Sequence, residues 1–140
     1  MTTLTTTKPA SAFGAGAVLE LAGRAGLAAI FVTSGLQKLG SYAGTAAWMD
    51  ASGVPGALLP AVIALEVLGG LAILLGFQAR WAALALAAFT AVAALVFHAD
   101  LADPVQSIMF WKNIAIAGGF LLLAANGAGR LSVDARRLRA

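Results

Sequence analysis

Four apolar runs, each about twenty residues long, restrict the folds that this chain can adopt. They cover residues 17–36, 57–77, 81–98 and 108–125. A helix of about 20 predominantly apolar residues is long enough to cross the hydrocarbon core of a bilayer, which is ~30 Å thick. The pattern therefore predicts an all-α integral membrane protein, a four-helix bundle that passes through the bilayer four times.

The amino-acid composition also indicates a protein that is embedded in lipid. Hydrophobic residues make up 61% of the 140 residues and charged residues only 11%, whereas soluble domains carry about 25% charged residues. A soluble protein of this size keeps much of its surface exposed and could not hide so many apolar side chains. The predicted partner of the apolar surface is the lipid bilayer.

The distribution of charge predicts the topology. The net charge is +3, but the basic residues form no patch with interleaved aromatic residues, so we expect no nucleic-acid partner. Cytoplasmic loops carry an excess of Lys and Arg, and four spans place both termini on one side. That side holds Lys8, Arg80, Arg130, Arg136, Arg137 and Arg139. We therefore expect both the N-terminus and the C-terminus to be cytoplasmic.

The regions outside the spans divide the chain into three parts. Residues 1–15 are polar and small, and we expect a disordered N-terminal tail with no cleaved signal peptide. Residues 16–128 form the transmembrane domain, in which residues 45–49 of the first loop could form a short helix on the bilayer surface. Residues 129–140 are expected to form a basic cytoplasmic tail.

Several kinds of reactive site are not indicated. The chain has no cysteine, so it has no disulfide, thiolate metal site or iron–sulfur ligation of its own. Its one histidine could not supply two axial ligands to a haem, and no carboxylate–histidine grouping has the spacing of a metal site. A nucleophilic triad is also missing, and we expect no catalysis by this chain alone.

Charged residues within the spans are the main candidates for a site. Such groups cost about 2.5–3.5 kcal/mol each on insertion scales and usually face a partner in the bundle interior. At 1.5 Å per residue, Arg24 lies ~12 Å and Glu66 ~14 Å from opposite ends of their spans. These depths predict an ion pair between Arg24 and Glu66, with Glu20, four residues before Arg24, as a second acceptor.

A second polar group is expected near the outer boundary. Lys112 and Asn113 lie about one turn inside the fourth span, and Lys38 and His98 end the first and third spans. Lys38 and His98 could simply reach the interface, as basic side chains at helix ends do. The alternatives for the whole set are a structural polar network, a proton relay, or a pocket for a polar head group such as a quinone ring.

The order of several short motifs resembles the DoxX family. The resemblance covers nearly the whole chain after the first fifteen or so residues. The matching segments are Gly23-Arg24, 34–39, 66–76 with Arg80, Lys112-Asn113 and 127–134. Carried over residue by residue, the matching positions are Arg24, Gly35, Lys38, Glu66, Gly69, Gly70, Gly76, Arg80, Lys112 and Asn113.

The resemblance implies a small four-helix protein of the bacterial inner membrane that is associated with respiratory or oxidative-stress redox complexes. The family's namesake is a subunit of an archaeal thiosulfate:quinone oxidoreductase. Our leading hypothesis is a membrane subunit with redox partner proteins, which binds a quinone head group among Arg24, Glu66, Lys112 and Asn113. The alternatives are a non-enzymatic scaffold that anchors partner proteins and a small transporter, which would need to form a homo-oligomer for alternating access.

Overall fold

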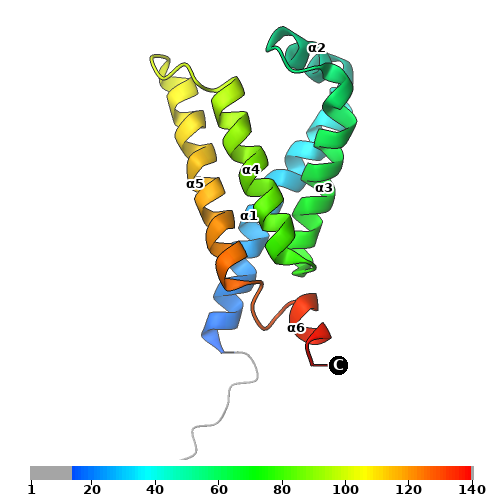
Figure 1. The fold of residues 1–140 in the computed structure, drawn as a ribbon, viewed down its shortest axis with the longest axis vertical. Coiled ribbons are helices and arrows are strands. Elements are labelled where there is room, and N and C mark those ends of the chain that lie inside the picture. The colour runs from blue at the N-terminus through cyan, green and yellow to red at the C-terminus, as the bar shows by residue number, and fades with distance from the viewer. Residues whose placement is uncertain (1–13, 140) are drawn as a thin grey trace, which may run out of the picture.

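The computed structural model describes residues 14–139, all of whose regular elements are helical. Four helices are long and apolar enough to cross a membrane. They are α1 (Ala15–Gly40), α3 (Leu59–Leu75, preceded by the 3-10 turn η1, Gly56–Leu58), α4 (Ala79–Phe97) and α5 (Pro104–Asn126). Two shorter helices, α2 (Tyr42–Ala51) and α6 (Val133–Arg137), lie at opposite ends of the molecule (Figure 1). The predicted all-helical fold with four spans is confirmed.

The apolar surface of the long helices faces outward. In the most apolar window of each helix, only 11% to 28% of the residues are buried inside the protein. A soluble bundle hides its apolar stripe and exposes its polar one, whereas here most apolar side chains are left for the surrounding medium. This arrangement is that of a protein whose solvent is lipid.

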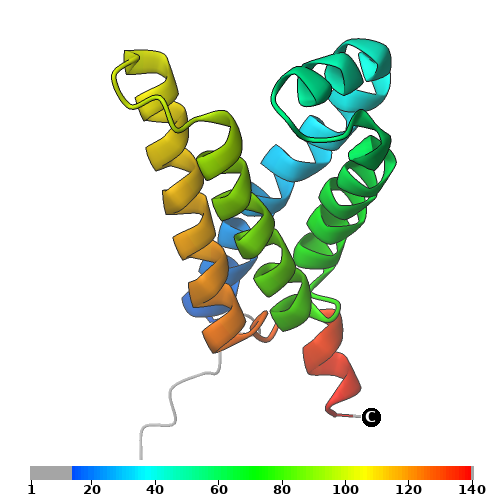
Figure 2. The same cartoon turned by 45° about the horizontal axis from the view of Figure 1, so that its top comes forward.

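The four long helices form two pairs. Helix α1 packs along α3, and α4 packs along α5, while contacts between the pairs are sparser. The pairs meet near the end of the bundle that holds both termini, here called the terminal end, and diverge toward the opposite, distal end (Figures 1 and 2). The bundle is therefore V-shaped, and it opens distally.

Small residues permit the close approach of α1 and α3. A Cβ atom on Gly70 would lie 2.8 Å from Cγ2 of Val32, and one on Gly35 would lie 2.6 Å from Cγ2 of Val67. In lipid, helices associate through such close packing because hydrophobicity gives no driving force between them. The register of the pair is fixed by these contacts, with Gly35 beside Glu66 and Val67.

A compact apolar core joins the two pairs in the half nearer the termini. The rings of Phe31 on α1 and Phe120 on α5 meet edge to face, with centroids 5.2 Å apart. Around them lie Ala28, Ile73, Ala83, Leu86 and Ala87. Because this core fills only the narrow part of the V, the distal part between the pairs is left for other groups.

The segment after α5 folds back onto the terminal end. Both carboxylate oxygens of Asp134 accept backbone hydrogen bonds at the start of α4, from Gln78 N (2.8 Å) and Ala79 N (2.9 Å). The first N–H groups of a helix have no partner within the helix. Asp134 therefore caps α4 from a distance of more than fifty residues along the chain, and Asp134 N donates to Gly76 O (2.9 Å) in the same turn.

Replacing Asp134 by alanine should test this cap. Loss of an N-cap side chain costs about 1 kcal/mol, so D134A is expected to lower the free energy of unfolding by about that amount without changing the helix content. The measurement is thermal unfolding in detergent, followed by circular dichroism. Asp100, which bonds only the nearby Ala102 N, provides the matched control D100A, and an equal loss in both variants would contradict the capping role.

The loops differ in detail from the sequence-based expectation. Helix α1 continues to Gly40, past the expected end of its span, and α2 begins at Tyr42. The helix expected at residues 45–49 therefore extends over ten residues, and neither Gly40 nor Gly44 interrupts the helix that contains it. Most of the expected N-terminal tail, residues 1–13, lies outside the described residues.

Candidate functional site

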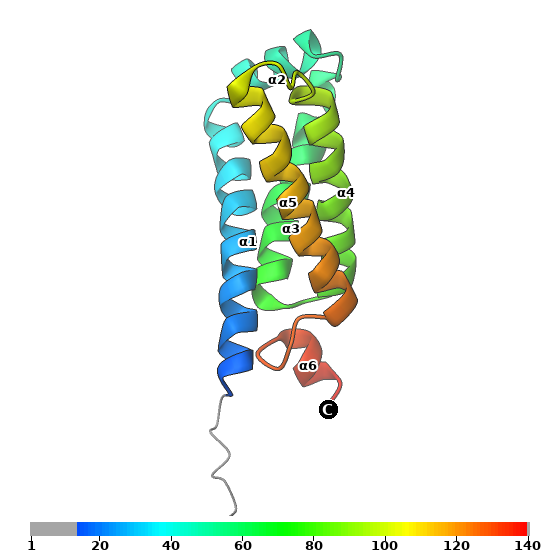
Figure 3. The same ribbon diagram turned by 90° about the vertical axis from the view of Figure 1, so that its left-hand side faces the viewer.

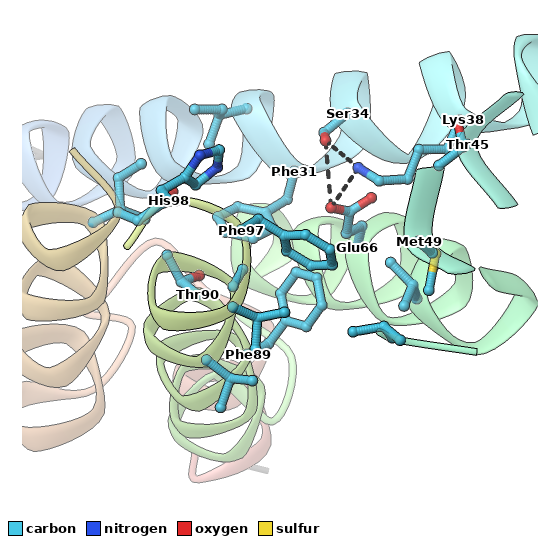
Figure 4. Close-up of a pocket in the computed structure, with 18 of the residues that line it drawn as sticks. Phe31, Ser34, Lys38, Thr45, Met49, Glu66, Phe89, Thr90, Phe97 and His98 are labelled. Carbon is cyan, nitrogen blue, oxygen red and sulfur yellow. Dashed lines mark hydrogen bonds and ion pairs between the residues drawn. The ribbon is translucent and has the colours of Figure 1, made fainter. Parts of the chain in front are cut away.

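A pocket of about 340 Å³ lies between the two helix pairs in the distal half of the bundle. Its walls come from all four long helices, and α2 contributes from the distal end (Figure 4). Five of the six residues expected at the site line it: Lys38, Glu66, His98, Lys112 and Asn113. The pocket follows directly from the V shape, because the apolar core that closes the bundle does not extend this far.

Glu66 and Lys38 form an ion pair on the α1–α3 wall. Nζ of Lys38 lies 2.9 Å from Oε1 of Glu66 and also donates to Oγ of Ser34 (2.7 Å). Ser34 Oγ in turn donates to the same Oε1 (3.3 Å). The side chain of Glu66 is 5% exposed and that of Lys38 is 24% exposed, so the carboxylate is the more buried partner.

The second oxygen of Glu66 has no partner. Within residues 14–139, Oε2 of Glu66 and Nε of Arg24 are the buried side-chain polar atoms left without a hydrogen bond. An unsatisfied buried acceptor costs about 1–3 kcal/mol, and more when it is charged. Such an atom beside a cavity indicates capacity for a ligand that donates a hydrogen bond.

The expected ion pair between Arg24 and Glu66 is not formed. Nη1 of Arg24 donates to the carbonyls of Ile73 (3.2 Å) and Leu74 (2.9 Å), and Nη2 donates to the carbonyl of Leu131. Helix α1 begins well beyond the end of α3 on the terminal side (Figure 3). Counting residues from the ends of the apolar runs therefore placed Arg24 and Glu66 at the same depth, whereas Arg24 lies beside Ile73 and Leu74 near the end of α3.

Glu20 is likewise not part of the pocket. A Cβ atom on Gly129 would overlap its carboxylate, so Glu20 lies against the segment that follows α5. Among the described residues, Lys38–Glu66 is the one ion pair within 4.0 Å. The expected set of Glu20, Arg24 and Glu66 is thus divided between the two ends of the molecule, with Glu20 and Arg24 at the terminal end.

The α4–α5 wall carries the remaining polar residues. Nδ1 of His98 lies 2.7 Å from Oε1 of Gln106; since an amide oxygen only accepts, Nδ1 carries the proton and Nε2 of a neutral ring is left as an acceptor. Nζ of Lys112, whose side chain is exposed, donates only to Sδ of Met109 (3.0 Å). Asn113 lines the pocket one residue further along α5.

Aromatic side chains line the space between the two polar walls. Figure 4 shows Phe31, Phe89 and Phe97 between Glu66 on one side and His98 on the other. The ring of Phe97 also stacks on Trp48 of α2, with centroids 4.4 Å apart. This stack ties the distal helix of one pair to α4 of the other and covers part of the pocket.

Sequence reasoning missed Ser34 and Thr90 as pocket residues. Ser34 lies four residues before Lys38, on the same helical face, and this spacing could have revealed it. Thr90 is 2% exposed and donates to the carbonyl of Leu86 (2.6 Å), an ordinary bond for a threonine in a helix, so the sequence gives no signal that it lines a pocket. Within residues 14–139, no group of His, Asp and Glu side chains could hold a metal ion.

Comparison with known proteins places the chain in a family. The family model described as DoxX matches residues 19–99, which is more than half of the chain and includes Lys38, Glu66 and His98. The chain belongs to the DoxX family. Helix α5, with Lys112 and Asn113, lies beyond the region that the DoxX model matches.

Two relatives of this DoxX protein are known from Escherichia coli (strain K12). Inner membrane protein YqjF is 53% identical over 105 residues, which cover 75% of this chain and 81% of YqjF. Inner membrane protein YphA is 38% identical over 127 residues, which cover 85% of this chain and 90% of YphA. No solved structure matches the chain. With four spanning helices and these relatives, the DoxX protein is a multi-pass protein of the bacterial inner membrane.

Proposed function

We propose that this DoxX protein is a membrane subunit that binds the head group of a quinone in the pocket between its helix pairs. The observation that carries the proposal is the buried carboxylate of Glu66, which lines the pocket beside Lys38 and has one oxygen without a partner. Ligand pockets are mostly apolar and contain a few placed polar groups. This pocket has that composition.

The size and setting of the pocket support a ring-shaped lipid-soluble ligand. Its volume of about 340 Å³ is near the lower end of the roughly 300–1,000 Å³ range of ligand pockets, which suits a single substituted ring better than a large cofactor. Aromatic neighbours such as Phe31, Phe89 and Phe97 prefer offset or edge-to-face contacts with another ring. A quinone also reaches the site directly, because it is dissolved in the same bilayer.

The residues of the chain would bind and orient the ring. The quinone supplies the redox chemistry when it is bound, and electrons would come from a redox partner protein, because the chain has no cysteine to relay them. Lys38 holds the carboxylate of Glu66 through their ion pair, and Ser34 is hydrogen-bonded to both side chains. We propose no role for Arg24 in the pocket, since its guanidinium is held by backbone carbonyls at the terminal end.

Replacing Glu66 by glutamine should weaken binding of the head group in its reduced, quinol form, whose hydroxyl can donate a hydrogen bond to the carboxylate. A hydrogen bond to a charged group contributes about 1.5–3 kcal/mol, so E66Q is expected to reduce the affinity by roughly tenfold or more. Binding can be followed with decylubiquinol by anaerobic isothermal titration calorimetry. Protein purified from membranes should also yield quinone on extraction and mass spectrometry.

The matched control is Glu20→Gln, which makes the same chemical change at the terminal end. E20Q should bind decylubiquinol as the unmodified protein does. If extraction finds no quinone and titration detects no binding in the unmodified protein, the proposal fails. Equal weakening in E66Q and E20Q would show a general loss of structure and would remove the assignment of Glu66.

A further inference from the structure

We propose that the pocket selects the reduced, dihydroxy form of its head group, a quinol, over the oxidised dicarbonyl form. The inference rests on the proposed function and adds the redox state of the ligand. The two forms share a ring and differ in hydrogen bonding. The oxygens of a quinone only accept hydrogen bonds, whereas each hydroxyl of a quinol donates one as well. A site therefore prefers the quinol if its unpartnered hydrogen-bonding atoms are acceptors, and the quinone if they are donors.

At the α1–α3 end of the pocket, the unpartnered atom is an acceptor. Oε1 of Glu66 already receives the ammonium of Lys38 and the hydroxyl of Ser34, while Oε2 receives nothing from the described residues. An ionised carboxylate accepts only. A quinol hydroxyl would satisfy it, and a quinone carbonyl in the same place would face it as a second acceptor.

A small rotation is enough to bring the carboxylate to the ligand. Oε2 is shielded from solvent in the present side-chain conformation. The last torsion of a glutamate joins an sp³ to an sp² carbon and has a broad minimum. The carboxylate can thus turn to present one oxygen to the pocket while the other keeps its bond to Lys38.

At the α4–α5 end, His98 also offers an acceptor. Its Nδ1 is used on Oε1 of Gln106, which leaves Nε2 of the neutral ring free to accept. Figure 4 shows His98 and Glu66 on opposite sides of Phe31 and Phe97. A ring with a hydroxyl at each end, lying among the aromatic side chains, matches this arrangement of two acceptors around an apolar centre.

The donors of the pocket contribute less to the preference between the two forms, because they are more exposed than the carboxylate of Glu66. Two hydrogens of the Lys38 ammonium are engaged by Ser34 and Glu66, and Lys112 is exposed. The half-buried amide of Asn113 carries both a donor and an acceptor, so it favours neither form of the ligand. An exposed donor already has water or a lipid head group as a partner, so a ligand only exchanges one bond for another. The buried oxygen of Glu66 has no partner to lose, and a donated hydrogen bond there is a net gain.

The test compares the two redox forms in the full-length protein in nanodiscs. Isothermal titration calorimetry under anaerobic conditions would measure Kd for decylubiquinol and decylubiquinone, and we expect the quinol to bind about tenfold more tightly. The dimethyl ether of the quinol keeps the ring and its oxygens but cannot donate, so it should bind no more tightly than the quinone. E66Q should bring the ratio of the two Kd values close to one, and E20Q should leave it unchanged.

The possible outcomes distinguish failure of the quinol preference from failure of the head-group site itself. If quinol and quinone bind with equal affinity, or if the dimethyl ether binds as tightly as the quinol, the selection is disproved while the quinone site stands. If neither form binds, the proposed function fails and this inference fails with it. The comparison of the three ligands uses the unmodified protein, so it is decisive even if E66Q does not fold.

Discussion

Replacing Arg24 by alanine is expected to lower the free energy of unfolding by about 3 kcal/mol, the largest loss for any single charged residue of this chain. Arg24 is 2% exposed, and its guanidinium satisfies the last carbonyls of α3 together with the carbonyl of Leu131. Alanine would leave the carbonyls of Leu74 and Leu131 without this donor, whereas the carbonyl of Ile73 would keep its bond from Gly76 N (3.2 Å). It would also open a cavity where three segments meet. Both changes destabilise the folded state.

Two further variants distinguish the hydrogen bonds from the charge. Arg24→Lys keeps the positive charge but lacks the planar fork that reaches several acceptors together, so it should recover only part of the loss. The exposed Arg139 is the control for the removal of one basic residue, and R139A should change stability by less than about 0.5 kcal/mol. Thermal unfolding in detergent measures all three, and full stability of R24K would show that charge alone is needed.

Replacing Lys38 by methionine is expected to cost about 2–3 kcal/mol, because it leaves the carboxylate of Glu66 buried without its ammonium. Removing one partner of a fully buried pair costs about 3–5 kcal/mol, and the partial exposure of Lys38 reduces that value here. Adding Glu66→Met should recover most of the loss, because apolar residues of similar size can replace a buried ion pair at little cost. Thermal unfolding of the two variants measures the recovery.

The K38M/E66M double variant also separates the functional hypotheses. A scaffold needs only a folded bundle, so a scaffold would keep its function in a stable double variant. A head-group pocket would lose its main acceptor, and decylubiquinol should bind at least about tenfold more weakly. A double variant that folds and still binds the quinol with unchanged affinity would contradict the role that we propose for this pair.

The sequence predicted the four spans because apolar length is a direct consequence of bilayer thickness. It also predicted most of the polar residues that line the pocket, since charged groups at membrane depth must face the interior. The pairing was wrong because depth was measured from the ends of the apolar runs. Helix α1 extends past α3 at the terminal end, so Arg24 lies level with Ile73 and Leu74, and Lys38 lies level with Glu66.

The partners of Arg24 could not have been predicted from side chains. Its acceptors are backbone carbonyls, which every residue carries and which leave no mark in the sequence. The same holds for the N–H groups that Asp134 caps. The family motif that ends at residues 127–134 indicated that this segment matters, but the structure was needed to show that it packs back onto the bundle and is more than a charged tail.

The position of Leu131 and Asp134 along the chain has a consequence for biogenesis. Both residues follow the last span, so they leave the ribosome after every other part of the bundle. Until then, α4 lacks its cap and Arg24 lacks one of its carbonyl partners. We therefore expect closure of the terminal end to be the last step in the assembly of the bundle.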